Sequence, residues 1–457
     1  MSARAATSKP RSARRSRAVA LPRLGAILTS RGLDPALFGL VLALAIAVYV
    51  PTAARVGYNT DEGQFIATGE YFDLVFLEHQ ITGPAWLPNY HTLTQPMLSR
   101  FIVGAGIHFA GLSAPPLDVH YREAEVNPET RGRYLQRETY RDERRVAEER
   151  RVDRPSSALL AAARSPMVLL SAFGASLLYV IGRLLAGPIA GLVAAGVAIW
   201  NPTMLTLLPR AHAEAPLFAA TLAVLLVGLL AARSVPQRRS VWLGVGCGIL
   251  LGLAISVKLT AALLAASLAV YAALAFVLWA ASGRSLVAAV AWRWSVLALV
   301  ISLVVMVAMN PFLYPNPVGR LQDMLAFRQQ EMFGQAVLSE NEAIPPGLGA
   351  RLPLLAERTL MDLATLNERL HAPLDVLLVV LGLLTLCYRI GRQRDAQTGL
   401  GPDALLLLCC AVMIVGLGWN IGVDWARYYL PLLTLSPVLI GIGADSLLRL
   451  VRRMARL

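Results

Sequence analysis

The sequence is poor in charged residues. Asp, Glu, Lys and Arg make up only 16% of its 457 residues, where a soluble globular chain carries about 25%. Hydrophobic residues make up 56%. This composition excludes a disordered chain, a collagen, a coiled coil and a disulfide scaffold, and it favours a protein that contacts lipid over much of its surface.

Lysine is scarce, and the charge that is present is concentrated. Lys9 and Lys258 are the only lysines, although the formal net charge is +13. Eight basic residues lie within the first 31 positions, ahead of the first apolar run. Because no basic stripe with interleaved aromatic residues appears, the charge does not indicate a nucleic-acid partner.

Cysteine is also scarce, with four residues, all inside apolar runs and without the spacing of metal ligands. They are Cys247, Cys387, Cys409 and Cys410.

Ten apolar runs have the length and composition of membrane-spanning helices, for which about 18 residues or more are needed. The sequence therefore predicts an all-α, polytopic membrane protein. The runs lie near residues 35–53, 164–182, 188–205, 214–232, 241–257, 259–282, 295–309, 374–388, 403–420 and 428–448.

The basic residues near the ends of these runs predict the orientation in the membrane. With the N-terminus inside, the inner segments hold most of the Arg and Lys, whereas the two short outer loops hold one each, Arg210 and Arg427. We therefore expect both termini in the cytoplasm. The predicted organisation is a basic tail (1–34), a membrane domain (35–448) and a second basic tail (449–457).

Two long segments, 54–163 and 310–373, then lie outside. In the first, the patterns of 61–77 and 96–109 indicate amphipathic helices at the interface. Residues 114–157 form an insert in which Arg and Glu alternate, typical of a solvated helix or, alternatively, of an arm that binds a partner. The second segment, with an amphipathic stretch at 322–332, is interpreted as a gate over a site or as a connector.

The polar residues that could take part in a reaction are concentrated on this outer side, where all six histidines fall. Asp61-Glu62 follows the first apolar run closely. The pair has two explanations: it caps the next helix, or Asp61 is a carboxylate base that accepts a proton from an attacking hydroxyl. The chain offers no Ser–His–Asp or Cys–His arrangement, glycine-rich phosphate loop or histidine-rich zinc motif.

Five short motifs in order along the chain carry a family resemblance. They are Tyr58-Asn59-Thr60-Asp61-Glu62, Leu93-Thr94-Gln95-Pro96, Arg210-Ala211-His212-Ala213-Glu214-Ala215-Pro216, a glycine at 252 leading to Lys258, and Arg427-Tyr428-Tyr429-Leu430-Pro431. From about 35 to 445, the chain resembles the polyprenyl-phosphate-sugar-dependent glycosyltransferases of the GT-C superfamily. Within it, the chain is most similar to the branch of protein O-mannosyltransferases and lipid A aminoarabinose transferases.

The resemblance implies a role for each motif. It implies that Asp61 is the catalytic base, with Glu62 beside it. It also matches Arg210, Lys258 and Arg427 to basic positions of the family's motifs, and we expect these three residues to hold the phosphate of the donor. At Gln95-Pro96 the chain departs from the family's usual Lys-Pro or His-Pro-Pro, so no donor contact is assigned to Gln95.

The phosphate role has a physical basis, because a leaving phosphate needs cations to stabilise its charge. For Arg210 and Arg427 the alternative is an arginine that reaches the lipid headgroups. For Lys258 a functional role is favoured more strongly, because this lysine stands between two apolar runs in a chain whose basic residues are otherwise almost all Arg.

Three further residues, His212, Glu214 and Tyr428, are expected to orient the acceptor or a metal. A divalent metal is a possible cofactor, with Asp61, His79 and His91 as candidate ligands and Glu78 nearby. No pair of them has diagnostic spacing, and a single histidine is more often a hydrogen-bonding surface residue.

The expected function is the transfer of a sugar, with inversion, from a polyprenyl-phosphate donor to a protein, lipid or polysaccharide acceptor outside the cytoplasm. The expected location is a bacterial cytoplasmic membrane. The alternatives are a transporter or flippase of lipid-linked glycans and a non-catalytic membrane subunit. Charged residues cluster at one face and no internal repeat is evident, which disfavours the transporter.

Overall fold

The chain is helical throughout most of its described length. The computed structural model describes residues 33–117, 119–121, 150–152, 154–235, 237–281, 285–338, 340–393 and 400–456. Within these ranges the only strand pairing is one pair of three-residue strands and a single isolated bridge. The predicted all-α class is confirmed.

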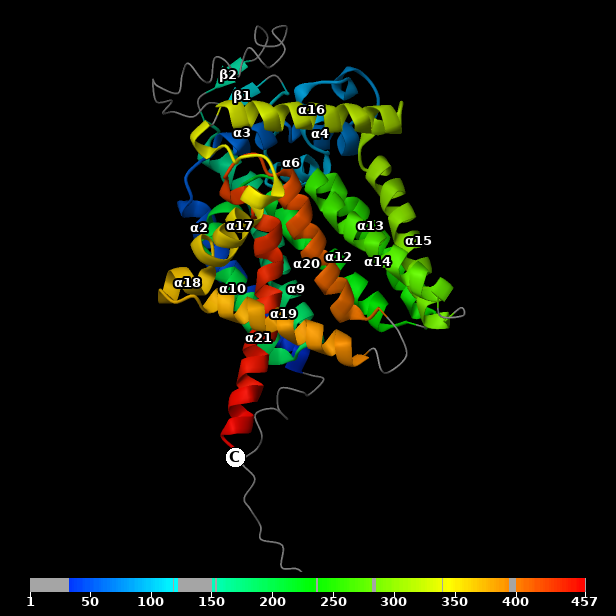
Figure 1. The fold of residues 1–457 in the computed structure, drawn as a ribbon. Helices are drawn as coiled ribbons and strands as arrows, with labels where there is room; N and C mark the ends of the chain where they lie inside the picture. Colours follow the sequence, from blue (N-terminus) through cyan, green and yellow to red (C-terminus); the bar gives the residue numbers. More distant parts are fainter. Residues whose placement is uncertain are drawn as a thin grey trace, which may run out of the picture.

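Nine helices in the described ranges are long and apolar enough to cross a bilayer. Figure 1 shows them packed into one bundle, with α19 lying obliquely across α21. They are α2 (Leu33–Arg55), α9 (Ser157–Leu185), α12 (Glu214–Arg233), α13 (Arg239–Val257), α14 (Ala262–Ala281), α15 (Leu286–Ala308), α19 (Leu374–Gln393), α20 (Pro402–Asn420) and α21 (Leu430–Met454).

The remaining predicted span, 188–205, is not a single helix. Its first part is α10 (Pro188–Ile199), which at 12 residues is about 18 Å long and shorter than the hydrocarbon core. The side chain of Asn201 then caps a separate short helix, α11 (Pro202–Leu207), by accepting a hydrogen bond from the backbone N–H of Met204. The interruption arises because a proline is favoured at the first position of a new helix but breaks a continuing one.

The first outer segment contains the two predicted amphipathic helices. Residues 61–77 form α3 (Thr60–Ala67), α4 (Glu70–Phe72) and a π-helical turn, η1 (Asp73–Leu77), and the second prediction corresponds to α6 (Leu98–Phe109). The break between α3 and α4 lies at the point where α6 crosses closely: a Cβ on Gly104 would lie 2.2 Å from the Gly69 carbonyl oxygen.

Between these elements lie η2 (Pro84–Trp86) and α5 (Tyr90–Thr94). Most of the charged insert 114–157 lies outside the described residues. Its two flanks pair as parallel strands, β1 (Val119–Tyr121) with β2 (Arg150–Val152).

The second outer segment runs over the same end of the bundle. It begins with η4 (Pro311–Leu313) and continues into α16 (Pro317–Leu338), which lies across the top of the bundle in Figure 1. The amphipathic stretch predicted at 322–332 is thus the middle of a longer helix. The rest of the segment is η5 (Glu340–Glu342), α17 (Leu348–Glu357), η6 (Arg358–Asp362) and α18 (Thr365–Leu370).

The opposite end of the bundle is organised by arginines. Arg233 of α12, Arg389 of α19 and Arg449 of α21 donate to three successive backbone carbonyls at 184–186, at 3.2, 2.8 and 2.9 Å. These carbonyls belong to the last turn of α9, where a helix leaves them unpaired and carries partial negative charge. The basic residues that predicted this side as the inner one therefore also fix the helix ends together. The last helix continues to Met454, beyond its predicted end at 448.

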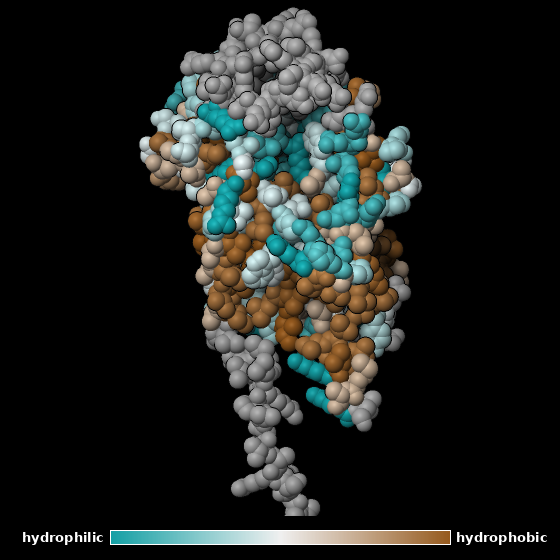
Figure 2. All heavy atoms as spheres, turned by 90° about the vertical axis from the view of Figure 1, so that its left-hand side faces the viewer, coloured by the Kyte–Doolittle hydropathy of each residue, from teal (hydrophilic) through white to brown (hydrophobic). Residues whose placement is uncertain are grey.

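The surface matches a membrane protein. On the face that Figure 2 shows, hydrophobic side chains cover the middle of the bundle and hydrophilic side chains gather above them, on the side of the outer segments.

Close packing of α19 against α21 depends on glycine. A Cβ on Gly382 would lie 2.3 Å from the carbonyl oxygen of Leu439, whereas a Cβ on Gly391, in the same helix, would meet no atom within 4 Å. We expect Gly382→Ala to lower the thermal unfolding temperature by several degrees, because overpacking costs about 1–3 kcal/mol. Gly391→Ala is the matched control and should be neutral or slightly stabilising. Equal unfolding temperatures for the two purified variants in detergent would contradict this packing.

Candidate active site

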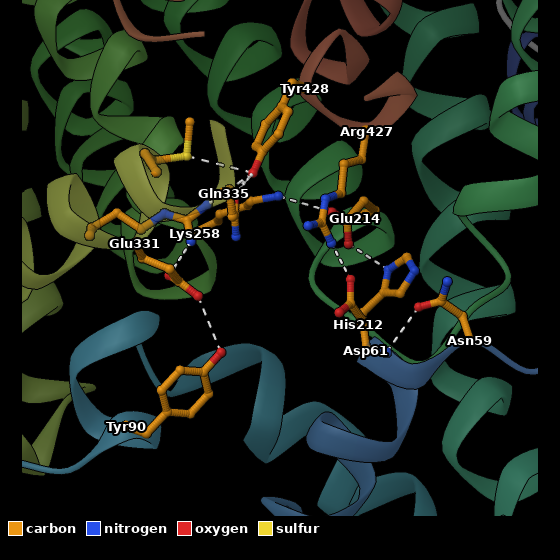
Figure 3. Close-up of polar contacts among 12 residues, drawn as sticks. Asn59, Asp61, Tyr90, His212, Glu214, Lys258, Glu331, Gln335, Arg427 and Tyr428 are labelled. Carbon is orange, nitrogen blue, oxygen red and sulfur yellow. Dashed lines mark hydrogen bonds and ion pairs between the residues drawn. The ribbon is translucent and has the colours of Figure 1, made fainter. Parts of the chain in front are cut away.

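Predicted site residues from distant parts of the chain meet at the end of the bundle covered by the outer segments. They come from the first turn of α3, the start of α12, the end of α13 and the short helix η7 (Ala426–Tyr428) before α21. Figure 3 shows Asp61, His212, Glu214 and Arg427 pointing toward one another, with Lys258 approaching Glu214 from the other side.

Asp61 forms an ion pair with Arg427, from Oδ2 to Nη1. The backbone positions the carboxylate: the Asn59 side chain caps α3 and accepts a hydrogen bond from the N–H of Asp61 at 2.9 Å. The exposed fractions of the two side chains are 41% for Asp61 and 26% for Arg427. This carboxylate is therefore accessible to a ligand.

The guanidinium of Arg427 lies over aromatic rings. Its central carbon is 4.7 Å from the ring centroid of Trp425 and 5.5 Å from that of Tyr428, and the two rings stack on each other. Burial lowers the pKa of Arg427, but Asp61, Tyr428 and Glu214 outweigh it, so the net pKa is raised. Arg427 is a permanent cation.

Glu214 lies deeper and holds two partners. Its Oε1 accepts from Lys258 Nζ at 2.9 Å, and its Oε2 lies 2.5 Å from Nδ1 of His212. All three residues are buried. Lys258 reaches Glu214 because α13 ends there, with Lys258 itself in an extended conformation before the short helix η3 (Leu259–Ala261).

Glu62 has a different environment from Asp61. It is fully buried, and its carboxylate pairs with Arg164 of α9 through Nε at 2.8 Å and Nη2 at 2.6 Å. It also accepts the N–H of Ala211 at 2.8 Å and that of Asn59 at 3.1 Å, which completes the capping box of α3. The capping explanation of the acidic pair thus applies to Glu62, which ties the first outer segment to α9 and to the loop before α12.

That loop carries Arg210, for which the described residues supply no anionic partner. None of the ion pairs among the described residues includes it, and its buried Nε has no hydrogen-bond partner there. Because a buried guanidinium nitrogen without a partner is unfavourable, the position suits an anionic ligand.

Sequence reasoning missed a group of residues on α16. Arg328 forms an ion pair with Glu331 at 2.5 Å, Glu331 accepts from the Tyr90 hydroxyl at 3.2 Å, and Gln335 accepts from the Tyr428 hydroxyl at 2.8 Å. The polar spacing 328, 331 and 335 places them on one helix face. That spacing is a signal in the sequence, although the segment was interpreted only as a gate or a connector.

The candidate metal ligands are not brought together. His79 is exposed in the turn after η1, whereas His91 is buried in α5. In the described part of the chain no group of three or more His, Cys, Asp or Glu side chains is placed to hold a metal ion. The described residues do not fit a protein-held divalent cation, and no chemical step is assigned to one.

This arrangement combines one accessible carboxylate with several cations. Asp61 can accept a proton, while Arg210, Lys258, Arg328 and Arg427 can stabilise negative charge on a leaving group. The site therefore suits a substrate that bears an anionic group beside the atom under attack.

The two neighbouring acids should respond differently to loss of charge. We expect Glu62→Gln to destabilise the protein by about 3 kcal/mol or more, because it leaves Arg164 buried without its counter-charge. Asp61→Asn should cost less than about 1 kcal/mol, since its ion pair is accessible to solvent. Thermal unfolding of the purified variants measures this, and similar losses for both would contradict the assignment of Glu62 as the structural acid.

Comparison with known proteins supports a common fold. The family model described as dolichyl-phosphate-mannose-protein mannosyltransferase matches residues 157–310. No curated protein sequence matches the chain.

Two solved structures illustrate the structural similarity. ArnT from Cupriavidus metallidurans, in the apo state, is 16% identical with a TM-score of 0.53, and the similarity covers 90% of this chain and 60% of ArnT. ArnT has also been solved bound to undecaprenyl phosphate, at 15% identity and a TM-score of 0.50, over 89% of this chain and 59% of ArnT.

The archaeal oligosaccharyltransferase AglB from Archaeoglobus fulgidus, in complex with an inhibitory peptide and a dolichol-phosphate, is 15% identical with a TM-score of 0.54. Here the similarity covers 93% of this chain and 52% of AglB. The chain thus spans little more than half the length of these neighbours. Together, the nine apolar helices of the described residues and the fold shared with these membrane enzymes indicate an integral membrane protein.

Proposed function

We propose that this protein is a glycosyltransferase that moves a sugar from a polyprenyl-phosphate carrier to a hydroxyl-bearing acceptor. The observation that carries the proposal is the juxtaposition of the accessible carboxylate of Asp61 with Arg427, near the buried Glu214–Lys258 pair. The loop that carries Arg210, whose Nε has no hydrogen-bond partner among the described residues, is bound to Glu62, the residue next to Asp61. The phosphate-bearing lipids in ArnT and AglB give this arrangement a chemical class of ligand.

In the proposed reaction, the acceptor hydroxyl oxygen attacks the anomeric carbon of the sugar. The bond from that carbon to the phosphate oxygen breaks, and the phosphate leaves on its lipid with the bonding electron pair. The hydroxyl proton passes to the carboxylate of Asp61. A single displacement of this kind inverts the configuration at the anomeric carbon.

The cations stabilise the charge that develops on the leaving phosphate. Arg427 is proposed to contact the phosphate because it pairs with the accessible Asp61, and Arg210 because its loop is bound to Glu62, next to Asp61. Lys258 is proposed to position Glu214 through their buried ion pair. His212 holds Glu214 in place, and Tyr428 holds α16 in place through Gln335.

The proposed orientation places this site on the outer face of the membrane and both termini in the cytoplasm. The arginines at the far end of the bundle support this orientation, since basic residues are enriched on the cytoplasmic side. A hydroxyl acceptor then approaches from outside, while the lipid tail of the donor stays in the bilayer beside the bundle.

The base assignment is tested by Asp61→Asn. We expect transfer from a synthetic undecaprenyl-phosphate sugar to fall by at least about 100-fold, because the amide cannot take the proton. Asp323→Asn, which changes an exposed carboxylate on α16, is the control and should retain full activity. Unchanged turnover in folded Asp61→Asn would remove Asp61 from the mechanism, and donor translocation without transfer in liposomes would favour a flippase.

A variant of Arg210 tests whether this arginine binds the donor phosphate or only reaches the lipid headgroups. We expect Arg210→Gln to raise the KM for the donor by about 10-fold or more, because a charge-assisted hydrogen bond to phosphate is lost. Arg55→Gln removes an exposed arginine at the same end of the bundle and should leave KM unchanged. If both variants behave alike in steady-state assays, Arg210 does not bind the donor.

A further inference from the structure

The ion pairs of the candidate site differ sharply in how accessible they are. In the Asp61–Arg427 pair the two side chains are 41% and 26% exposed. In the Lys258–Glu214 pair they are 11% and 6% exposed. A ligand that enters the site therefore meets Arg427 while it is engaged by Asp61.

This difference decides which pair a phosphate can open. An ion pair exposed to solvent contributes little to stability, whereas breaking a buried pair leaves an uncompensated charge. Separating Asp61 from Arg427 therefore costs little free energy, whereas separating Lys258 from Glu214 costs much more. Arg427 also keeps the influence of Glu214 when Asp61 moves away, so its cation is not left without any counter-charge.

An ion-paired Asp61 is a poor base for the proposed reaction. Its Oδ2 is occupied by a guanidinium N–H, and the adjacent positive charge stabilises the unprotonated carboxylate. A phosphodiester can take over that N–H, because guanidinium binds phosphate as readily as it binds carboxylate.

We propose that the donor phosphate displaces Asp61 from Arg427, so that donor binding releases the catalytic base. This inference rests on the proposed function and adds an order to it: the donor binds first and the acceptor second. Without donor, Asp61 is masked, which keeps it from activating water or acceptor.

Arg210 provides the first contact for the incoming phosphate. It is the cation of the site without an anionic partner among the described residues. The donor phosphate can therefore bind it without breaking an existing ion pair. Arg427 follows when Asp61 gives way. The Ala211 N–H to Glu62 hydrogen bond holds the Arg210 loop against the first outer segment, and thus near Asp61.

The exchange also orders product release. After transfer, the Asp61 carboxyl carries the acceptor proton and is neutral, while the leaving phosphate has gained the bonding electron pair and remains with Arg427. Asp61 can compete for Arg427 again only after its proton passes to solvent or to the phosphate. The lipid phosphate therefore leaves last.

The test is a binding measurement with undecaprenyl phosphate on the full-length protein in detergent, for example by native mass spectrometry. We expect Asp61→Asn, which removes the competitor for Arg427, to bind undecaprenyl phosphate about two- to fivefold more tightly than wild type. The catalytically impaired variant is thus the tighter binder. Asp323→Asn, the matched carboxylate on α16, should bind like wild type.

The double variant separates displacement from a general charge effect. We expect Arg427→Gln to weaken binding, and Asp61→Asn added to Arg427→Gln to give no further gain, because the shared partner is gone. An unchanged or weaker affinity of Asp61→Asn would overturn the inference. The same gain in both backgrounds would also overturn it, since the effect would then not pass through Arg427.

The failure of this inference is distinguishable from failure of the proposed function. If wild type binds undecaprenyl phosphate and transfers its sugar while Asp61→Asn binds no more tightly, only the masking of Asp61 is wrong. If wild type shows no binding of undecaprenyl phosphate at any concentration tested, both are wrong.

Discussion

The candidate site depends on the buried ion pair between Glu62 and Arg164. Arg164 also donates to the backbone carbonyls of Ala53 and Val56 at the end of α2, at 2.6 and 2.8 Å. One guanidinium thus joins the end of α2, the first turn of α3 and the body of α9. Because Glu62 also binds the N–H of Ala211, the same contact fixes the loop before α12. Asp61 is positioned by the same contacts because it directly precedes Glu62 in the first turn of α3.

This arrangement explains why two adjacent acids have separate roles. A helix turns by about 100° from one residue to the next, so side chains at 61 and 62 cannot share one environment. Glu62 faces α9 and is saturated by donors, whereas Asp61 is left at the accessible edge with Arg427. The buried Glu62–Arg164 pair thus holds the helix turn from which Asp61 reaches Arg427.

The sequence predicted the membrane fold and the spans with long apolar runs. Of the candidate site residues that it indicated, Asp61, Glu214, Lys258 and Arg427 lie close together in the fold, and their roles stay predictions. The sequence did not predict the break in 188–205, where composition is apolar but Asn201-Pro202 starts a new helix. It also did not predict the pairing of Asp61 with Arg427, because the two are 366 positions apart and only the fold brings them together. The α16 residues were missed because their partner, Tyr428, lies on a distant element.

The arginine contacts at the end of α9 also have a consequence for how a displacement is transmitted through the bundle. Arg449, one of the three residues that bind those carbonyls, lies in α21. Arg427, which pairs with Asp61, lies just ahead of the same helix. Helix α21 is therefore tied to α9 at one end and to the candidate site at the other, so that a shift of this helix along its axis disturbs both sets of contacts together.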